Sequence, residues 1–232
     1  MRTSIWTKLL DLISPRICAI CGERLSVNEQ VLCATCHMHL PMTHYEQLPL
    51  DNPLCRLFWG QFPIERAAAL FFYEPQSPSS KMIYDMKYRS MPEIGEGLGK
   101  ITARQFAEAG FFEGIDALVP MPITRRRQWQ RGYNQSMEIA RGMKAVTGLP
   151  IYNKVVRRIH FHESQTAQHA WERLRNVDDA FLLSDPDRIA GKHILLIDDI
   201  ITTGATVIAC GKELAKAPDV RISILSLGLT KS

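Results

Sequence analysis

Short apolar runs recur through the second two thirds of the chain, and most are bounded by glycine, proline or charged residues. Runs of four to nine residues rich in β-branched and aromatic side chains are typical of buried strands. The runs predicted to be strands are 66–74, 116–121, 151–156, 180–183, 193–197 and 221–229. The regular recurrence of such runs predicts a sheet.

Between these runs, apolar residues recur at helical spacing. Residues 79–110 predict two helices, the second beginning at Pro92 and ending at Gly110, and 135–147 predicts a helix that Gly148 ends. A last helix is expected from about Ala205 to Ala217. Strands that alternate with helices indicate an α/β fold with a parallel sheet covered by helices on both faces.

The first third of the chain lacks this alternation. Residues 1–40 predict a short amphipathic helix followed by a small cysteine-containing module. Residues 41–65 contain four prolines that break any period, and we expect a linker there. The α/β domain is expected over 66–232, with a charged loop at 157–178.

Composition supports one medium domain with a small satellite module. The chain has 232 residues, 46% of them hydrophobic, and a formal charge of +4, which permits phosphate-bearing partners without requiring them. No stretch approaches the roughly 20 apolar residues of a membrane span. Charged residues interrupt the N-terminus, unlike a secretory signal. We therefore expect a cytoplasmic protein with reduced thiols.

Four of the six cysteines form two C-x-x-C pairs, Cys18 with Cys21 and Cys33 with Cys36. Two residues between thiolates let one turn point both sulfurs at one ion, and two such turns complete a tetrahedral zinc shell. Gly22 follows the first pair, where a tight turn requires a positive φ. The module is too short to fold by burial alone, so the zinc is expected to be structural.

Two other interpretations of these cysteines are a redox C-x-x-C motif and free buried thiols. The presence of two C-x-x-C pairs close together favours zinc over both. His37 and His39 are expected to be solvated neighbours of the site. Cys55 and Cys210 stand alone and are interpreted as small apolar residues.

The 193–206 stretch, HILLIDDIITTGAT, combines a buried strand with polar chemistry. Asp198 and Asp199 end the strand, where open α/β sheets bind ligands. Adjacent carboxylates suit a ribose diol with Mg²⁺. Small residues then lead into a helix whose N-terminal amides suit a phosphate. These residues are Thr202, Thr203, Gly204, Ala205 and Thr206. Together they indicate a ribose 5-phosphate site.

The stretch 194–206 resembles the phosphoribosyl pyrophosphate (PRPP) loop of type I phosphoribosyltransferases. A Walker B strand also ends in an acid, but it requires a Walker A partner, and the nearest candidate, 93–101, lacks the spacing and the Ser/Thr. A mere helix cap would leave the threonines unexplained. The resemblance implies a type I phosphoribosyltransferase-like sheet and Mg²⁺ bound with PRPP.

Further segments resemble the ComF/GntX family of competence-associated proteins over nearly the whole chain. They are the VPMP strand end (119–122), Arg131–Gln135 (RGYNQ), a loop with Gln165, Arg173 and Asn176, and the four-cysteine module. The chain departs from many members in offering only Cys55 where they have further cysteine pairs, so a second metal site is not expected.

The resemblance suggests Arg131, Gln165 and Arg173 as catalytic candidates. Three arginines follow the 116–121 strand, where similar enzymes have a pyrophosphate-binding loop: Arg125, Arg126 and Arg127. A solvated surface run or a contact with nucleic acid explains these arginines equally well. The 157–178 loop resembles a loop that closes over PRPP. Residues 66–110 are placed like the hood that selects the acceptor, where Glu74, Asp85 and Glu93 are candidates for a base by type alone.

Two functions stay open at this stage. One is a PRPP-binding protein of DNA uptake or utilisation, with single-stranded DNA and a helicase-type competence protein as possible partners implied by the resemblance. The alternative is an active transferase that moves ribose 5-phosphate from PRPP to an unidentified nitrogen acceptor. Fold alone does not separate them.

Overall fold

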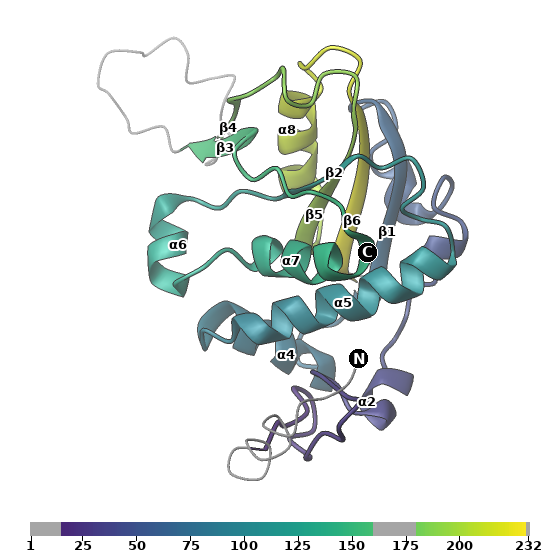
Figure 1. The fold of residues 1–232 in the computed structure, drawn as a ribbon, viewed down its shortest axis with the longest axis vertical. Helices are drawn as coiled ribbons and strands as arrows, with labels where there is room; N and C mark the ends of the chain where they lie inside the picture. Colours follow the sequence, from purple (N-terminus) through teal and green to yellow (C-terminus); the bar gives the residue numbers. More distant parts are fainter. Residues whose placement is uncertain (1–14, 160–179, 231–232) are drawn as a thin grey trace.

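A four-stranded parallel sheet forms the centre of the molecule (Figure 1), in a computed structural model that describes residues 15–159 and 180–230. Its order is β1-β6-β5-β2. The strands are β1 (Ile64–Tyr73), β2 (Ala117–Pro120), β5 (His193–Ile201) and β6 (Arg221–Thr230). All three pairings are parallel, which confirms the predicted class of sheet.

Helices cover both faces of this sheet, as predicted. Alternate residues of β5 enter two different cores: Leu195 and Ile197 pack with the helices of one face, and Ile194 and Leu196 with those of the other. The first face carries α4 (Pro78–Tyr88), α5 (Pro92–Glu108) and α7 (Gln135–Thr147). The second carries α8 (Ala205–Leu214). The apolar runs are therefore buried on both sides.

Three local expectations are wrong. Within the expected 151–156 strand, Ile151 makes an isolated bridge with Leu118, and only Val156 belongs to a strand, β3, which begins there and ends at Ile159. It pairs antiparallel with β4 (Ala180–Leu183), outside the main sheet. A bend at Lys154 and Val155 separates Ile151 from the strand and delays its start. Helix α8 ends at Leu214 instead of Ala217, because Pro218 prevents its continuation.

The third correction concerns the arginine-rich segment, which forms a helix, α6 (Arg125–Arg131), instead of a loop. Thr124 caps it by accepting from the Arg127 N–H at 3.2 Å, and Gly132 ends it in the left-handed region. None of its residues is buried, so no apolar stripe announced this helix.

Residues 41–65, expected as a linker, run along β1. Three backbone hydrogen bonds of 2.7–3.1 Å join this segment to the strand, at Pro41, Thr43 and Pro49. Two short helices lie within it, η1 (Tyr45–Gln47) and α3 (Pro53–Arg56). Leu54 and Phe58 are buried in the α8-side core. The division of the chain at residues 40 and 65 stays a prediction.

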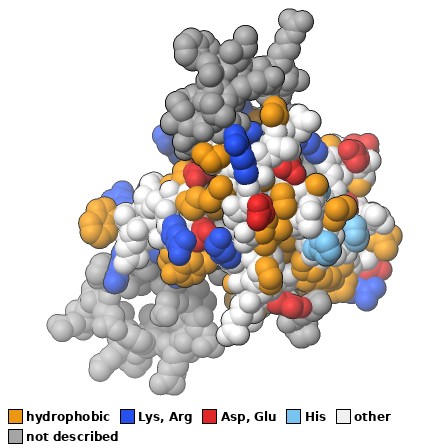
Figure 2. Space-filling view, turned by 90° about the horizontal axis from the view of Figure 1, so that it is seen from below, with side chains coloured by type: hydrophobic (Ala, Val, Ile, Leu, Met, Phe, Trp, Pro, Cys, Tyr) orange, Lys and Arg blue, Asp and Glu red, His pale blue; other side chains and the backbone are white. Residues whose placement is uncertain are grey.

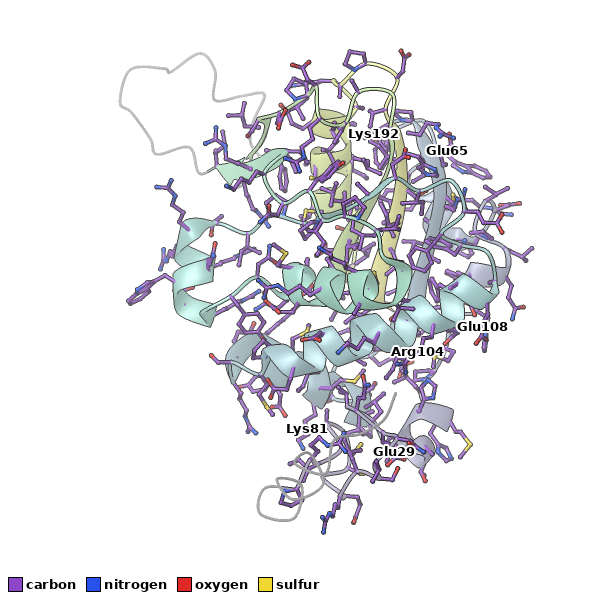
Figure 3. All side chains as sticks on the ribbon, viewed as in Figure 1. Glu29, Glu65, Lys81, Arg104, Glu108 and Lys192 are labelled. Atoms are coloured by element: carbon purple, nitrogen blue, oxygen red, sulfur yellow. The ribbon has the colours of Figure 1, made fainter. Side chains whose placement is uncertain are left out.

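The cysteine module, with the short helix α2 (Ala34–Met38), packs on the opposite face. Val31 and Leu32 belong to the same core as α4 and α5. A Cβ added at Gly97 of α5 would overlap Val31. On the exposed side of α5, Arg104 and Glu108 lie one turn apart (Figure 3). Among the described residues, no helix is both long and apolar enough to cross a membrane.

Candidate functional site

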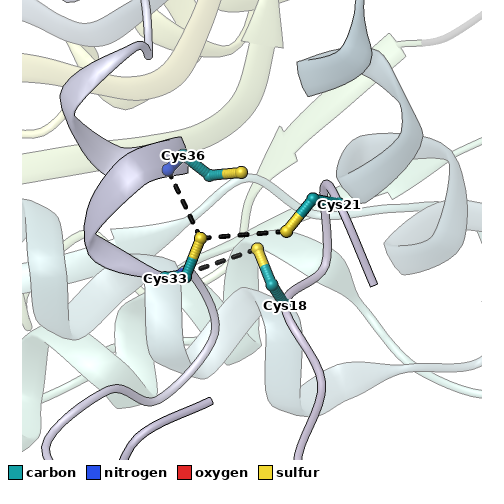
Figure 4. Close-up of side chains that lie close together, drawn as sticks. All are labelled: Cys18, Cys21, Cys33 and Cys36. Carbon is teal, nitrogen blue, oxygen red and sulfur yellow. Dashed lines mark hydrogen bonds between the residues drawn. The ribbon is translucent and has the colours of Figure 1, made fainter. Parts of the chain in front are cut away.

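The four predicted cysteine ligands lie together in space (Figure 4). Their Sγ atoms are all within 4.8 Å of one another, and those of Cys21 and Cys33 are 3.8 Å apart. A tetrahedral zinc with Zn–S bonds of about 2.3 Å requires sulfurs about 3.8 Å apart. The donor set and its spacing therefore fit one zinc ion in a four-sulfur shell.

Backbone groups fix this arrangement. Gly22 has φ of +79° and its N–H donates to the Cys18 carbonyl at 2.9 Å, which forms the first turn. The Cys33 N–H donates to Cys18 Sγ at 3.4 Å, and Cys33 Sγ accepts from the Cys36 N–H at 3.4 Å at the start of α2. Burial raises the pKa of Cys18, but backbone hydrogen bonds outweigh burial and lower that pKa to about 7. Such bonds stabilise the thiolate that a metal binds.

In the described part of the chain, the remaining cysteines and histidines lie outside this cluster. Cys55 and Cys210 are buried in the α8-side core, which agrees with their interpretation as small apolar residues. His39 is exposed, and its Nδ1 lies 2.8 Å from the Thr35 carbonyl oxygen. Among the described residues, the metal-compatible cluster contains the four cysteines alone.

The carboxylates of Asp198 and Asp199 lie beyond the end of a neighbouring strand. β2 stops at Pro120, opposite Ile197, whereas β5 continues along β6 to Ile201. The two carboxylates thus lie in the strand, not after it, and face a cavity of about 140 Å³. Its polar lining residues are Lys87, Arg127, Arg131, Gln135, Ser136, Arg158, Asp198, Asp199 and Thr206.

The two aspartates have different partners. Lys87 of α4 pairs with Asp199, with Nζ 3.0 Å from Oδ2, and both side chains are largely buried. Asp198 accepts from the Ser136 hydroxyl at 3.4 Å and from the Asp199 N–H at 2.9 Å. Burial and the Asp199 charge raise the pKa of Asp198 to about 7. One carboxylate is paired with a cation, and the other titrates near neutrality.

The predicted phosphate loop joins β5 to α8. Thr202, Thr203 and Ala205 are exposed, and the residues 198 and 200–207 enclose a hollow of about 50 Å³. Gly204 has φ of +77° at the N-cap of α8. A Cβ there would lie 2.7 Å from Leu57 Cδ2, so this glycine is required by the fold itself. The first amides of α8 have no partner within the helix and suit an anion.

The RGYNQ segment forms the joint between α6 and α7. Tyr133 donates its hydroxyl to the Met86 carbonyl of α4, and Asn134 caps α7 while donating to the Met121 carbonyl at 3.0 Å. These bonds position Arg131 and Gln135, which line the cavity and are joined by a 2.8 Å hydrogen bond. The Gln135 Nε2 atom is buried without a partner in the described part of the chain.

The helix separates the three consecutive arginines. Arg127 lines the cavity with the carboxylates, whereas Arg125 lines an adjacent groove of about 530 Å³ and Arg126 lines neither. Arg158 of β3 borders both spaces. Sequence reasoning missed Lys87 and Ser136, because nothing in their local patterns distinguishes them from helix-surface residues. Arg158 falls within the 157–178 loop that the resemblance placed over the ligand.

Several candidates lie elsewhere. Gln165, Arg173 and Asn176 fall outside the described residues. Glu74, Asp85 and Glu93, the candidate bases, are absent from the cavity lining. Asp85 instead pairs with Arg89, with Nε 3.3 Å from its Oδ1.

Two curated relatives align over most of the chain. The chain is 30% identical to the DNA utilization protein YhgH of Escherichia coli K12, over 82% of this chain and 80% of that protein. It is 31% identical to the competence protein ComFC of Bacillus subtilis, over 91% of this chain and 78% of that protein. No family model matches the chain.

Solved structures show weaker likeness. Glutamine PRPP amidotransferase from B. subtilis, complexed with ADP and GMP, matches at 18% identity and a TM-score of 0.42, over 62% of this chain and 30% of that one. A likeness at this level is too partial to assign a function.

Proposed function

Because the chain belongs to the ComF/GntX family, with YhgH and ComFC as relatives, we propose that it serves DNA uptake or utilisation through a site that binds PRPP or a related phosphoribosyl ligand with Mg²⁺. In this proposal it works in the cytoplasm. Single-stranded DNA and a helicase-type competence protein are its proposed partners, as the family resemblance implies.

The observation that carries the proposal is the convergence of three chemistries on one edge of the sheet. Two carboxylates face a cavity, a threonine loop leads into a helix N-terminus beside them, and cationic side chains stand opposite. Asp198 and Asp199 would hold Mg²⁺ and the ribose diol, because carboxylate oxygens suit both. Residues 202–206 would hold the 5-phosphate through their amides and hydroxyls.

The cations of the cavity match the other end of the ligand. Arg127, Arg131 and Lys87 would face the pyrophosphate, whose negative charge they neutralise. Lys87 pairs with Asp199 in the ligand-free protein and stands beside the proposed pyrophosphate position. Asp198 and Asp199 would hold Mg²⁺, which would supply positive charge next to the ligand.

The four-cysteine cluster is proposed to hold a structural zinc. All four of its ligand positions are cysteine sulfurs, so the shell would be closed and would leave no position for a substrate. Zinc would stabilise the turns that present Val31 and Leu32 to the core.

Calorimetric titration with PRPP, with and without Mg²⁺, tests the ligand proposal. The change Asp198→Asn should weaken PRPP binding at least about tenfold, because it removes a charge that Mg²⁺ requires. Sulfate, which needs only the loop, should bind the variant almost unchanged. The matched control is Asp187→Asn, at an exposed position before the other end of β5.

Equal losses of PRPP and sulfate binding in the Asp198 variant would mean that this carboxylate shapes the loop instead of reading the ribose. Absence of PRPP binding by the unaltered protein at millimolar concentration would remove the proposed site. The change Thr203→Val should weaken both ligands, because its hydroxyl belongs to the loop.

A transferase activity is the second candidate, and the cations beside the carboxylates favour it. A nitrogen nucleophile would form a bond to the anomeric carbon while the bond from that carbon to pyrophosphate breaks, and the developing charge would fall near Arg127 and Arg131. Release of pyrophosphate from PRPP, measured with a panel of nitrogen bases, decides between binding and transfer. Release that persists at the same rate in the Arg131→Gln variant would argue against the assigned role.

A further inference from the structure

Helix α4 carries three side chains that matter for the cavity. Lys87 and Tyr88 follow Tyr84 by three and four residues, so each of them lies next to Tyr84 on the helix. Lys87 reaches Asp199 in the cavity. The rings of Tyr84 and Tyr88 lie against each other, with centroids 4.9 Å apart and planes inclined by 42°. The cation of this helix thus points into the proposed site, with two aromatic rings beside it.

The tyrosine pair is continuous with the cavity wall. Arg131 lines the cavity, and its guanidinium lies 5.7 Å from the centre of the Tyr88 ring. The Tyr133 hydroxyl holds the Met86 carbonyl, and the Ser90 hydroxyl donates to the Arg131 carbonyl at 3.4 Å, so this end of α4 is fastened to the α6–α7 joint. The rings therefore have a defined position relative to the cavity.

Both rings remain open to solvent. Tyr84 is 54% exposed and Tyr88 is 63% exposed, so neither contributes much burial to the folded chain. From below, exposed hydrophobic side chains are seen beside Lys and Arg side chains (Figure 2). Exposed aromatic rings next to an arginine form a surface on which a planar heterocycle stacks, and stacking of this kind accepts any base.

We propose that Tyr84 and Tyr88 form a stacking surface for the base of a nucleotide whose ribose phosphate occupies the neighbouring cavity. The inference rests on the proposed phosphoribosyl site and adds the chemical class of the group attached to the ribose. Because the surface carries rings and a guanidinium in place of a buried polar pocket, it discriminates weakly between bases.

Calorimetric titrations with ribose 5-phosphate, AMP and CMP, at one Mg²⁺ concentration, test this proposal. AMP should bind at least about tenfold more tightly than ribose 5-phosphate, with CMP between them, because a purine offers the larger stacking area. In the Tyr84→Leu/Tyr88→Leu double variant, AMP affinity should fall to that of ribose 5-phosphate. Ribose 5-phosphate affinity should stay unchanged, which also shows that the variant is folded.

Two control variants sharpen the result. Tyr84→Phe/Tyr88→Phe keeps the rings and should keep the AMP preference. Trp129→Leu removes an aromatic ring that is 86% exposed on α6 and lines neither cavity nor groove, and it should change nothing.

The possible results distinguish failure of the stacking surface from failure of the proposed phosphoribosyl site. Equal affinities of the unaltered protein for AMP and ribose 5-phosphate overturn the stacking surface and leave the phosphoribosyl site standing. An AMP preference that survives the leucine variant places the base elsewhere and also overturns it. Failure of both ribose 5-phosphate and PRPP to bind removes the proposed function itself.

Discussion

Asp198 and Asp199 are adjacent in the sequence but differ in their electrostatic surroundings. Asp199 forms an ion pair with Lys87, whose Nζ lies 3.0 Å from its Oδ2. Asp198 is partly buried beside the Asp199 charge, and its pKa is raised to about 7. A mutational test that treats the pair as equivalent would mix two opposite effects on stability.

Replacing Asp198 with Asn is expected to stabilise the ligand-free protein at alkaline pH. A raised carboxyl pKa means that the folded state binds this proton more tightly than the unfolded chain, so wild-type stability falls as pH rises from about 4 to about 7. Asparagine removes this dependence. The free energy of unfolding of the variant, relative to that of the wild type, should therefore increase by roughly 1–3 kcal/mol from pH 5 to pH 8. Urea unfolding at both pH values measures the gain. A constant difference between the two proteins would contradict it.

Replacing Lys87 with Met, in contrast, is expected to destabilise the folded protein. The change leaves the Asp199 carboxylate without its cation in a largely buried setting, and should cost about 1–3 kcal/mol at pH 8. The matched control is Lys100→Met, which breaks a more exposed pair with Glu96 and should cost under about 0.5 kcal/mol. Equal losses of unfolding free energy in urea would mean that the Lys87–Asp199 pair stabilises the protein no more than the exposed Lys100–Glu96 pair does.

At the scale of elements, the regularly spaced glycines of α5 allow other parts of the chain to pack closely against this helix. The 93–101 stretch carries glycines at every second position and has a superficial likeness to a phosphate loop. In the fold, a Cβ at Gly99 would overlap the Ile139 carbonyl of α7, and one at Gly97 would overlap Val31 of the cysteine module. These glycines let α7 and the module approach the helix closely.

The change Gly97→Ala is expected to destabilise the protein by about 1–3 kcal/mol, although alanine is the better helix former. The added methyl group collides with Val31, so Val31→Ala in the same chain should recover most of the loss. A double-mutant cycle in urea measures the coupling. Additive losses would mean that the two residues do not meet.

The cysteine cluster is expected to hold about one zinc per chain, measured by metal analysis of the purified protein. Serine at Cys33 and Cys36 should release the metal and loosen the module, while the parallel sheet and PRPP binding persist. The control is Cys210→Ser, at a buried cysteine in the other core, which should retain the metal. Purified protein without zinc would be incompatible with the proposed shell.

At the scale of the whole molecule, charge is mixed more than segregated. The chain carries a formal charge of +4, and positive and negative side chains share the face seen in Figure 2. The groove beside the cavity is lined by four arginines, Arg125, Arg141, Arg157 and Arg158. Such a surface attracts phosphates without reading sequence.

We expect weak, sequence-independent binding of single-stranded DNA that declines as salt increases. The double change Arg125→Gln/Arg157→Gln, at two residues that line the groove, should lower the slope of log affinity against log salt by about 1–2. Lys192→Gln/Arg221→Gln removes the same charge at the other end of β5 and β6 and serves as the control. Fluorescence anisotropy with labelled oligonucleotides measures both. Affinity independent of salt would contradict the electrostatic basis.

By itself the sequence determined the elements and the chemistry carried by contiguous residues. The buried runs of β1, β5 and β6, helices α5 and α7, the two C-x-x-C turns and the threonine loop all depend on neighbours in the chain, so periodicity and spacing report them. Segments without an apolar stripe, such as α6, gave no such signal. The antiparallel β3–β4 pair was missed for a related reason, since strand patterns do not encode direction.

Only the tertiary structure decided which distant side chains meet. Lys87 reaches Asp199, Tyr133 fastens α4, Arg127 turns toward the cavity while Arg125 does not, and Val31 fills the space above Gly97. Each of these contacts depends on the packing of elements far apart in the chain. The periodicity of a sequence shows which face of a helix or strand is buried. Which element packs against that face depends on the packing of the whole molecule.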